Sequence, residues 1–139
     1  MKPFQLIYAS TASEKMTLET VRSMAAESHK NNLGKDITGL LLYFRGYFIQ
    51  VLEGEQEHIN ALYLKISGDS RHRDLRILNY CQIAYKNFND WAMRCVIYKP
   101  GHKASEIIDE YFPGSDPYDI SLERANFFIH DIKRELVEL

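Results

Sequence analysis

The sequence predicts an α+β fold in which two helices cover one face of a β-sheet and two further helices cover the other face. Strand-like alternation and helical three- and four-residue spacing follow one another in the order βαββαββ and then αα. A helix after the first and third strands is the split βαβ pattern of ferredoxin-like folds. Apolar residues fall on both faces of the predicted sheet, so both faces need cover.

The first half of the chain contains a strand, a helix and a hairpin. The strand FQLIYAS spans 4–10 and places Tyr8 and Ser10 on one face. Thr17 can cap the helix, which is expected to end near Gly34, where glycine permits a positive φ. DITGLLLYFRGYFIQVLEGE then indicates two strands that turn at Arg45-Gly46. The helical stripe consists of Leu18, Val21, Met24, Ala25 and Ser28.

The second half repeats this alternation and ends in helices. A helix is predicted after Gly54 and stops at Gly68, with the stripe Ile59, Leu62, Tyr63 and Ile66. The strands RILNYCQIAY and AMRCVIY follow. One terminal helix runs roughly over 103–111. The other carries Leu122, Ala125, Ile129, Ile132, Leu136 and Leu139.

Gln50 is a polar residue in the middle of an apolar strand, on the same side as Phe48 and Leu52. An unpaired buried amide costs about 1–3 kcal/mol, so Gln50 needs partners. In the predicted topology the first and third strands are neighbours, and the face that includes Tyr8 looks toward the crossover helices. The Tyr8 hydroxyl is therefore the predicted partner of Gln50.

Neighbouring side chains follow from the same choice of faces. Gln5 is expected to point outward, away from the crossover helices. Arg94 should also point away from them, which sends Met93 inward, and Trp91, two residues earlier, is considered for the same inward side. The far face carries Ile7, Leu40, Leu42, Phe44, Ile49, Val51 and Val96. The C-terminal helices are expected to cover it, although a partner chain could share this task.

Composition excludes several functional classes. The chain has 139 residues and a net charge of −2 with interspersed signs, which argues against nucleic-acid binding. No apolar run approaches the ~20 residues of a membrane span, and no signal peptide is evident, so a cytoplasmic protein is expected. Cys81 and Cys95 are interpreted as two small buried thiols. The histidines lack metal-ligand spacing, and no hydrolytic triad is evident.

Two functions of other classes remain open for such a fold. An acylphosphatase-type enzyme needs an arginine in the first loop, where STASEKMT offers only Lys15. A plain interaction module could instead bind a small ligand between the helices, with the Tyr8–Gln50 pair purely structural.

Six fragments in register resemble the BLUF domains, a family of bacterial flavin-binding blue-light sensors. They are LIYAS, the asparagine pair 31–32, DITGLLLY, FIQVLEGE, DSRH and NFNDWAM, and together they cover about 3–97. Asn87 and Arg94 stand where many members have an arginine and a glycine.

The resemblance implies a blue-light photoreceptor that binds flavin, usually FAD, with FMN possible. The ring would lie between the crossover helices, with Asn32 on its polar edge and Gln50 bridging Tyr8 to flavin N5 and O4. Light would draw an electron and a proton from Tyr8, both would return, and Gln50 would keep a changed hydrogen-bond arrangement. Met93 or Trp91 would then respond. The residues implied in the photochemistry are Tyr8, Ser10, Gln50, Trp91 and Met93.

The resemblance also implies a set of cofactor contacts, some of which belong to the sugar and phosphate tail. The set is Tyr8, Met24, Ser28, Asn31, Asn32, Gln50, Lys65, Ile66, Asp69, Arg71 and His72. Taken singly, each has a structural interpretation. Met24 and Ile66 could be core residues, Asn32 a helix C-terminal residue, and Arg71 and His72 a solvated helix end.

The expected organisation is a photosensory domain over 1–99 and a helical extension over 100–139. With no enzymatic domain expected after Pro100, the chain resembles the short stand-alone members. Such a protein has no catalytic turnover. Its expected partners are flavin, a downstream signalling protein and further copies of itself, with neither nucleic acid nor membrane.

Overall fold

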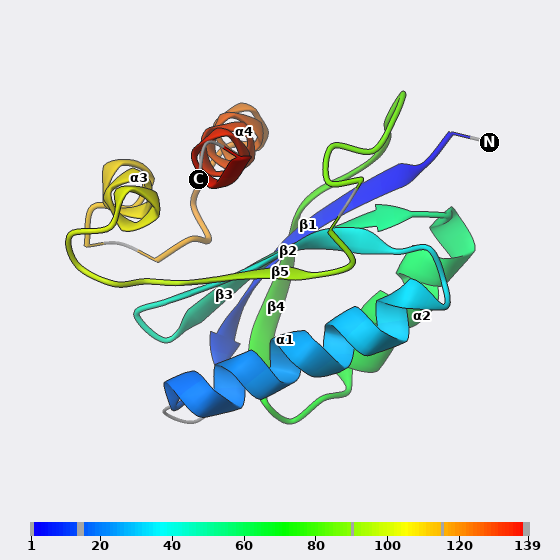
Figure 1. Ribbon diagram of the computed structural model, residues 1–139, viewed down its shortest axis with the longest axis horizontal. Helices are drawn as coiled ribbons and strands as arrows, with labels where there is room; N and C mark the ends of the chain where they lie inside the picture. The colour runs from blue at the N-terminus through cyan, green and yellow to red at the C-terminus, as the bar shows by residue number, and fades with distance from the viewer. Residues whose placement is uncertain (1, 14–15, 90, 115, 138–139) are drawn as a thin grey trace.

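The computed structural model describes residues 2–13, 16–89, 91–114 and 116–137. The elements follow one another in the predicted order (Figure 1). They are β1 (Phe4–Ala12), α1 (Leu18–Leu33), β2 (Thr38–Phe44), β3 (Tyr47–Gly54), α2 (Gln56–Ser67), β4 (His72–Gln82), β5 (Arg94–Ile97), α3 (Lys103–Tyr111) and α4 (Leu122–Val137).

One sheet, with the strand order β4-β1-β3-β2-β5, organises the molecule. β1 lies between β3 and β4 and is antiparallel to both, whereas β5 forms one edge and runs parallel to β2. Helices α1 and α2 lie on one side of the sheet, and α3 and α4 lie on the other (Figure 1). The predicted ferredoxin-like α+β fold is confirmed, including the position of the two C-terminal helices.

Each face of the sheet has its own hydrophobic core. The helix-side core lies between the sheet and α1 and α2, and includes Leu6, Tyr8, Val21, Met24, Leu41, Phe48, Leu52, Ile59 and Met93. The far-face core includes Ile7, Leu40, Leu42, Phe44, Ile49, Val51 and Val96, together with Ile108, Phe128, Ile129 and Ile132 of α3 and α4. The prediction that the terminal helices cover the far face is confirmed.

The β2–β3 hairpin turns at Arg45 and Gly46, as predicted. Their φ values are +51° and +82°, the left-handed pair that a two-residue type I′ turn needs. The Arg45 side chain crosses to the terminal helices, where its Nη1 donates to the Phe112 carbonyl oxygen at 2.6 Å and its Nη2 pairs with Asp109. The hairpin tip therefore ties the sheet to the helical extension.

Three local expectations, for Gly34, Cys81 and Cys95, are wrong, whereas the expected orientation of Gln5 is confirmed. Gly34 caps α1 with a φ of −73°, and Asp36 takes the positive φ of +51° instead. Cys81 is exposed and Cys95 is only half-buried, because both lie on the two edge strands. Gln5 does point away from α1 and α2, but it is buried on the far face.

His72 is also placed differently from the solvated helix end that the local sequence favours. It begins β4, which starts four residues before the predicted strand. Pairing with Ala12 extends the strand at this end, and a positive φ of +52° at Asp74 accommodates the irregular register between β1 and β4.

The backbones of β2 and β3 approach closely at Gly39, so adding one methyl group there should strongly lower the free energy of unfolding. A Cβ at Gly39 would lie 1.9 Å from the backbone oxygen of Val51, which cannot move without breaking the strand pair. We expect Gly39→Ala to lower the free energy of unfolding by at least about 3 kcal/mol in urea denaturation. Gly34→Ala, where nothing lies within 4 Å and φ is negative, is the matched control and should be neutral or slightly stabilising. Equal stability of the two variants would contradict this packing.

None of the helices in the described part of the chain combines the length and the apolar composition that a membrane crossing requires.

Candidate functional site

Tyr8 and Gln50 form the centre of the helix-side core. They are register partners on β1 and β3, and both are almost fully buried. The Tyr8 hydroxyl donates a hydrogen bond to Gln50 Oε1. The alternation of the two strands produces this contact, because it turns both side chains toward α1 and α2.

The other end of the Gln50 amide contacts Met93. Gln50 Nε2 donates to Met93 Sδ at 3.5 Å, a contact with a weak acceptor. Met93 precedes β5 and is buried in the helix-side core, as expected. Gln50 thus bridges Tyr8 on β1 and the segment that leads into β5.

Trp91 lies on the opposite side of the sheet from the hydrogen-bonded chain Tyr8–Gln50–Met93, which we call the relay. Its ring packs against the far-face core, 5.5 Å from the ring of Phe88, with the Arg94 guanidinium 4.8 Å from its centroid. The inward orientation considered for Trp91 is therefore wrong in this structure. Strand alternation does not govern Trp91, because the segment before β5 is irregular.

Burial strongly raises the pKa of the Tyr8 hydroxyl, and the nearby Tyr63 and Asp69 raise it further. Its ring meets the Tyr63 ring edge-on at 5.6 Å and lies 6.4 Å from the His72 ring. Tyr8 therefore stays protonated at neutral pH. A shift in pH near neutrality does not remove its proton. Removal of an electron from the ring would, because oxidation makes the phenolic proton far more acidic.

Ser10 and His72 make a second hydrogen-bonded pair beside the first. Ser10 Oγ lies 2.8 Å from His72 Nδ1, and the His72 ring rests 4.8 Å from that of Phe48. Burial lowers the pKa of His72, whereas the carboxylate of Asp69 opposes this shift. A neutral His72 results, with one ring nitrogen available to accept and the other to donate.

Asp69 and Arg71 form an ion pair after α2. Arg71 Nε lies 3.0 Å from both carboxylate oxygens of Asp69, and Arg71 Nη1 lies 3.9 Å from Glu27 on α1. Hydrogen bonds from Arg71 hold the pKa of Asp69 down at about 2. Arg71 thus links the segment that follows α2 to the side of α1, the two helices that flank the helix-side core.

The Asp69–Arg71 pair predicts a pH dependence of stability. The pKa of Asp69 is lower in the folded state, about 2, than its ordinary value of 3.8. The stabilisation is present above about pH 4 and is lost as the pH falls toward 2. We expect Asp69→Asn to flatten the loss of urea stability over that interval. Asp119→Asn, which removes an exposed carboxylate, should keep the wild-type profile, and the same slope in all three proteins would contradict the assignment.

A cavity of about 50 Å³ opens between α1, α2 and the sheet. Its lining brings together most of the residues predicted to contact a cofactor: Met24, Ser28, Gln50, Ile66, Asp69, Arg71 and His72, with Leu41 and Glu27. The other four do not line it: Asn31 and Lys65 are exposed, whereas Tyr8 and Asn32 are buried beside the cavity-lining elements. The lining combines the apolar side chains of Met24, Leu41 and Ile66 with the Gln50 amide and the charged Asp69–Arg71 pair.

Asn32 is buried at the end of α1, where its Nδ2 donates to the Ala92 carbonyl oxygen at 3.0 Å. Its side-chain oxygen has no hydrogen-bond donor among the described residues, so it is open to accept one from a ligand. The hydrogen bond from Asn32 to Ala92 ties α1 to the segment between Trp91 and Met93.

Glu53 is a fully buried carboxylate that the sequence reasoning missed. It accepts hydrogen bonds from Gln5 Nε2 at 2.8 Å, from the backbone N–H groups of Asn87 and Phe88 at 2.7 and 2.9 Å, and from Asn87 Nδ2 at 2.9 Å. These bonds fasten the loop before Trp91 to the far face. The sequence does contain a signal for it. In FIQVLEGE, Glu53 follows Ile49 and Val51 at two-residue steps, which places an acid on a buried apolar face where it needs hydrogen-bond donors.

The fold and the site together define a ligand-binding domain. The hydrogen-bonded residues Tyr8, Gln50 and Met93 lie beside a cavity between the two crossover helices. The cavity lining offers both apolar side chains and the Gln50 amide to a flavin. Across the described ranges, no group of three or more histidine, cysteine, aspartate or glutamate side chains could hold a metal ion.

Comparison with known families identifies the class further. Residues 4–94 match the family described as BLUF, sensors of blue-light using FAD. The match covers more than half of the chain, and the chain belongs to the BLUF family. Residues 4–94 therefore form a flavin-binding blue-light sensor domain, and for this part of the chain the assignment replaces the acylphosphatase-type and plain interaction alternatives.

Two curated relatives illustrate the context of such domains. Photoactivated adenylate cyclase subunit alpha of Euglena gracilis is 40% identical over 70 residues, which are 50% of this chain and 7% of that protein. The blue light- and temperature-regulated antirepressor BluF of Escherichia coli (strain K12) is 31% identical over 70 residues, 50% of this chain and 17% of that protein. The chain spans less than a fifth of the length of either relative.

Solved structures extend the similarity beyond the matched segment. The photo-activated state of BlsA has a TM-score of 0.83 at 26% identity and covers 94% of both chains. A bacterial light-regulated adenylyl cyclase has a TM-score of 0.70 at 28% identity, covering 86% of this chain and 42% of that one. The dark state of the BLUF protein BlrB, at 24% identity and a TM-score of 0.76, shares the fold.

Proposed function

We propose that the light signal is a rearrangement of the hydrogen bonds of Gln50, with Tyr8 as the donor of an electron and a proton. One observation carries the proposal. Gln50 holds Tyr8 at its oxygen and Met93 at its nitrogen, so turning over or tautomerising the amide changes both contacts at once. A side chain with a single polar function could not do this.

The cavity residues fit a flavin ring. Met24 and Ile66 are apolar, and Gln50 has N–H groups held only by a sulfur. Asn32 does not line the cavity, but its side-chain oxygen at the end of α1 is open to a donor. Small-molecule pockets hold about 300–1,000 Å³, so a bound ring would need more room between α1 and α2 than this cavity of about 50 Å³ offers. Bound flavin supplies, on absorbing blue light, a strong oxidant. Ser10 and His72 would fix the local polarity beside Tyr8.

In the proposed cycle Tyr8 gives up an electron and its phenolic proton and then takes both back. Its burial favours this coupled transfer, because a lone tyrosinate or radical cation would be poorly solvated there. The rearranged Gln50 amide would then donate more strongly to a bound flavin, which would shift the flavin absorption to longer wavelength. No bond is made or broken in net terms, and we propose no catalytic turnover.

We propose FAD as the cofactor, with FMN as the alternative. Arg71 at the charged end of the cavity supplies a cation for the phosphate tail, and the exposed Lys65 on α2 a second one. Chromatography of the cofactor released by heating would distinguish the two.

The proposed output passes from Met93 into β5 and then to partners. Met93 is one residue from the start of β5, which is the last strand of the proposed photosensory part, 1–99, before the helical extension, 100–139. We propose that light alters association with a downstream protein or with further copies of this chain.

Infrared difference spectroscopy with isotopically labelled glutamine tests the role of Gln50. Light-minus-dark spectra should contain side-chain amide bands that move with the label and disappear in Gln50→Glu. Labelled and unlabelled proteins with identical difference spectra would refute a glutamine switch, even if flavin bands respond to light.

A further inference from the structure

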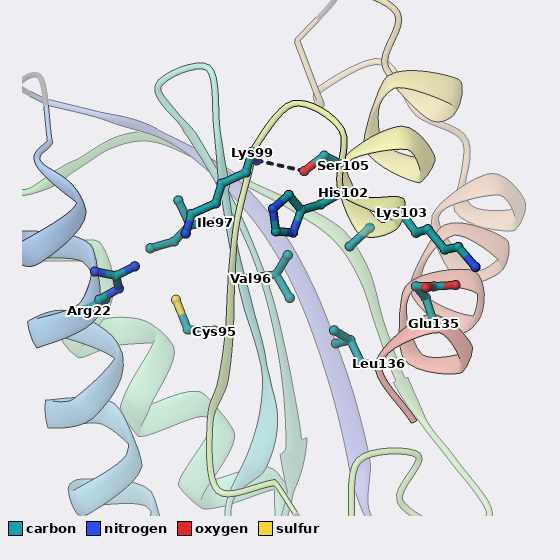
Figure 2. A pocket seen from close by; sticks show the side chains of 11 residues that line it. Arg22, Cys95, Val96, Ile97, Lys99, His102, Lys103, Ser105, Glu135 and Leu136 are labelled. Carbon is teal, nitrogen blue, oxygen red and sulfur yellow. Dashed lines mark hydrogen bonds between the residues drawn. The ribbon is translucent and has the colours of Figure 1, made fainter. Parts of the chain in front are cut away.

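A groove follows the free edge of β5 and lies outside the cavity described above. It has a volume of about 620 Å³ and runs between α1 on one side and α3 and α4 on the other (Figure 2). The lining residues used below are Arg22, Cys95, Ile97, Lys99, Ala104 and Leu136.

The backbone of β5 is open toward this groove. The N–H group of Tyr98 donates to the Tyr43 carbonyl oxygen on β2 at 3.0 Å, so Val96 and Arg94, at two-residue steps, also face β2. The N–H and C=O groups of Cys95 and Ile97 therefore face away from the sheet. The next outward N–H group, that of Lys99, is already taken by Ser105 Oγ at 2.8 Å. The open edge is thus short and has a defined end.

The two walls of the groove differ in chemistry. Arg22 stands on the α1 side, and Lys99 extends along β5 toward that side (Figure 2). Neither cation makes an ion pair within 4 Å among the described residues. The opposite wall presents Ala104 and Leu136 beside β5, and it also carries one charge of each sign, Lys103 on α3 and Glu135 on α4 (Figure 2). An extended chain alternates its side chains between two such walls.

We propose that the groove binds an extended acidic segment of a partner protein, which adds to β5 as a further strand of the sheet. Its main chain would bond to Cys95 and Ile97. Acidic side chains at every second position would meet Arg22 and Lys99, and the intervening apolar ones would meet Ala104 and Leu136. Single-sign charge on one wall selects an anionic partner.

A second copy of this chain fits the groove less well. Pairing two β5 edges about a two-fold axis would bring Arg22 and Lys99 of each copy near the same two cations of the other. Like charges that face each other across paired strands are destabilising. The edge is thus better matched to a chain of opposite charge.

The groove also lies next to the proposed light relay. Met93, which accepts from Gln50, stands two residues before Cys95, on the same face of the chain. Docking itself stands without the photochemistry, whereas any dependence of docking on light rests on the proposed function.

The test uses the whole flavin-loaded protein and a fluorescent blocked peptide of about eight residues in which glutamate and valine alternate. We expect saturable binding, at least about tenfold weaker for the peptide with lysine in place of glutamate. Two further peptides carry N-methyl groups at either the odd or the even positions. One should lose binding and the other should keep it, because only one edge of the peptide faces β5.

The protein variants locate the contact. Arg22→Glu combined with Lys99→Glu should weaken the acidic peptide about tenfold and favour the lysine peptide. Lys35→Glu combined with Arg73→Glu, the same charge change outside the groove, should bind as wild type. Equal binding by the two double variants, or by both methylated peptides, would overturn the proposal. So would competition by citrate alone, which would indicate a small-anion site, or self-association that the peptide does not disturb.

The absorption shift is recorded in the same samples, which separates the two proposals. A normal shift without peptide binding in light or dark overturns the docking site and leaves the sensor mechanism intact. Binding in the dark without any shift supports the docking site and counts against the mechanism. A shift together with a light-dependent affinity supports both.

Discussion

Replacing Tyr8 with phenylalanine is expected to abolish the light-induced red shift while the protein still binds flavin. The substitution removes the hydroxyl that donates to Gln50 and keeps the ring that fills the helix-side core. Without that hydroxyl the side chain has no proton to transfer. Gln50 Oε1 loses its partner, and the free energy of unfolding should fall by about 1–3 kcal/mol.

Absorption spectra before and after blue light measure this effect, and Tyr63→Phe is the matched control. Tyr63 meets the Tyr8 ring edge-on in the same core, but its hydroxyl does not bond Gln50. The Tyr63 variant should retain a red shift close to that of wild type. A full red shift in Tyr8→Phe would contradict the assigned donor.

Replacing Gln50 with leucine is expected to remove the red shift as well, for a different reason. Leucine fills a similar volume but has neither an oxygen for Tyr8 nor a nitrogen for Met93 or the flavin. Electron transfer from Tyr8 can still occur, so flavin fluorescence should remain quenched in this variant. The lasting change in absorption should be absent, because the amide is its proposed source.

Gln5→Leu is the control for loss of a buried amide. Gln5 lies on the neighbouring strand but faces the far-face core, where it donates to Glu53 at 2.8 Å. This variant should lose about 1–3 kcal/mol of stability and keep its photoresponse. A red shift that is lost in both variants would point to general destabilisation rather than to a switch at Gln50.

The relay was predictable because it depends on strand alternation and topology. Two-residue periodicity placed Tyr8 and Gln50 on the same side of adjacent strands, and the need to satisfy a buried amide supplied the bond between them. The far-face core followed from the same alternation, and the terminal helices supplied its cover.

Features outside regular strands were not predictable in this way. Trp91 lies in an irregular segment, so its side was open in sequence and is decided by packing against Phe88 and Arg94. Glu53 was overlooked because its hydrogen-bond donors, the backbone N–H groups of Asn87 and Phe88, come from a loop 34 and 35 residues away. His72 joins β4 through pairing with Ala12, which local sequence does not encode.

The most direct test of the central claim is the visible absorption spectrum of the purified protein in the dark, after blue light and during recovery. We expect an oxidised-flavin spectrum that shifts slightly to longer wavelength and relaxes fully in the dark. A flavin spectrum that stays unshifted, or that bleaches to a reduced form, would contradict a signal held in the hydrogen bonds of Gln50.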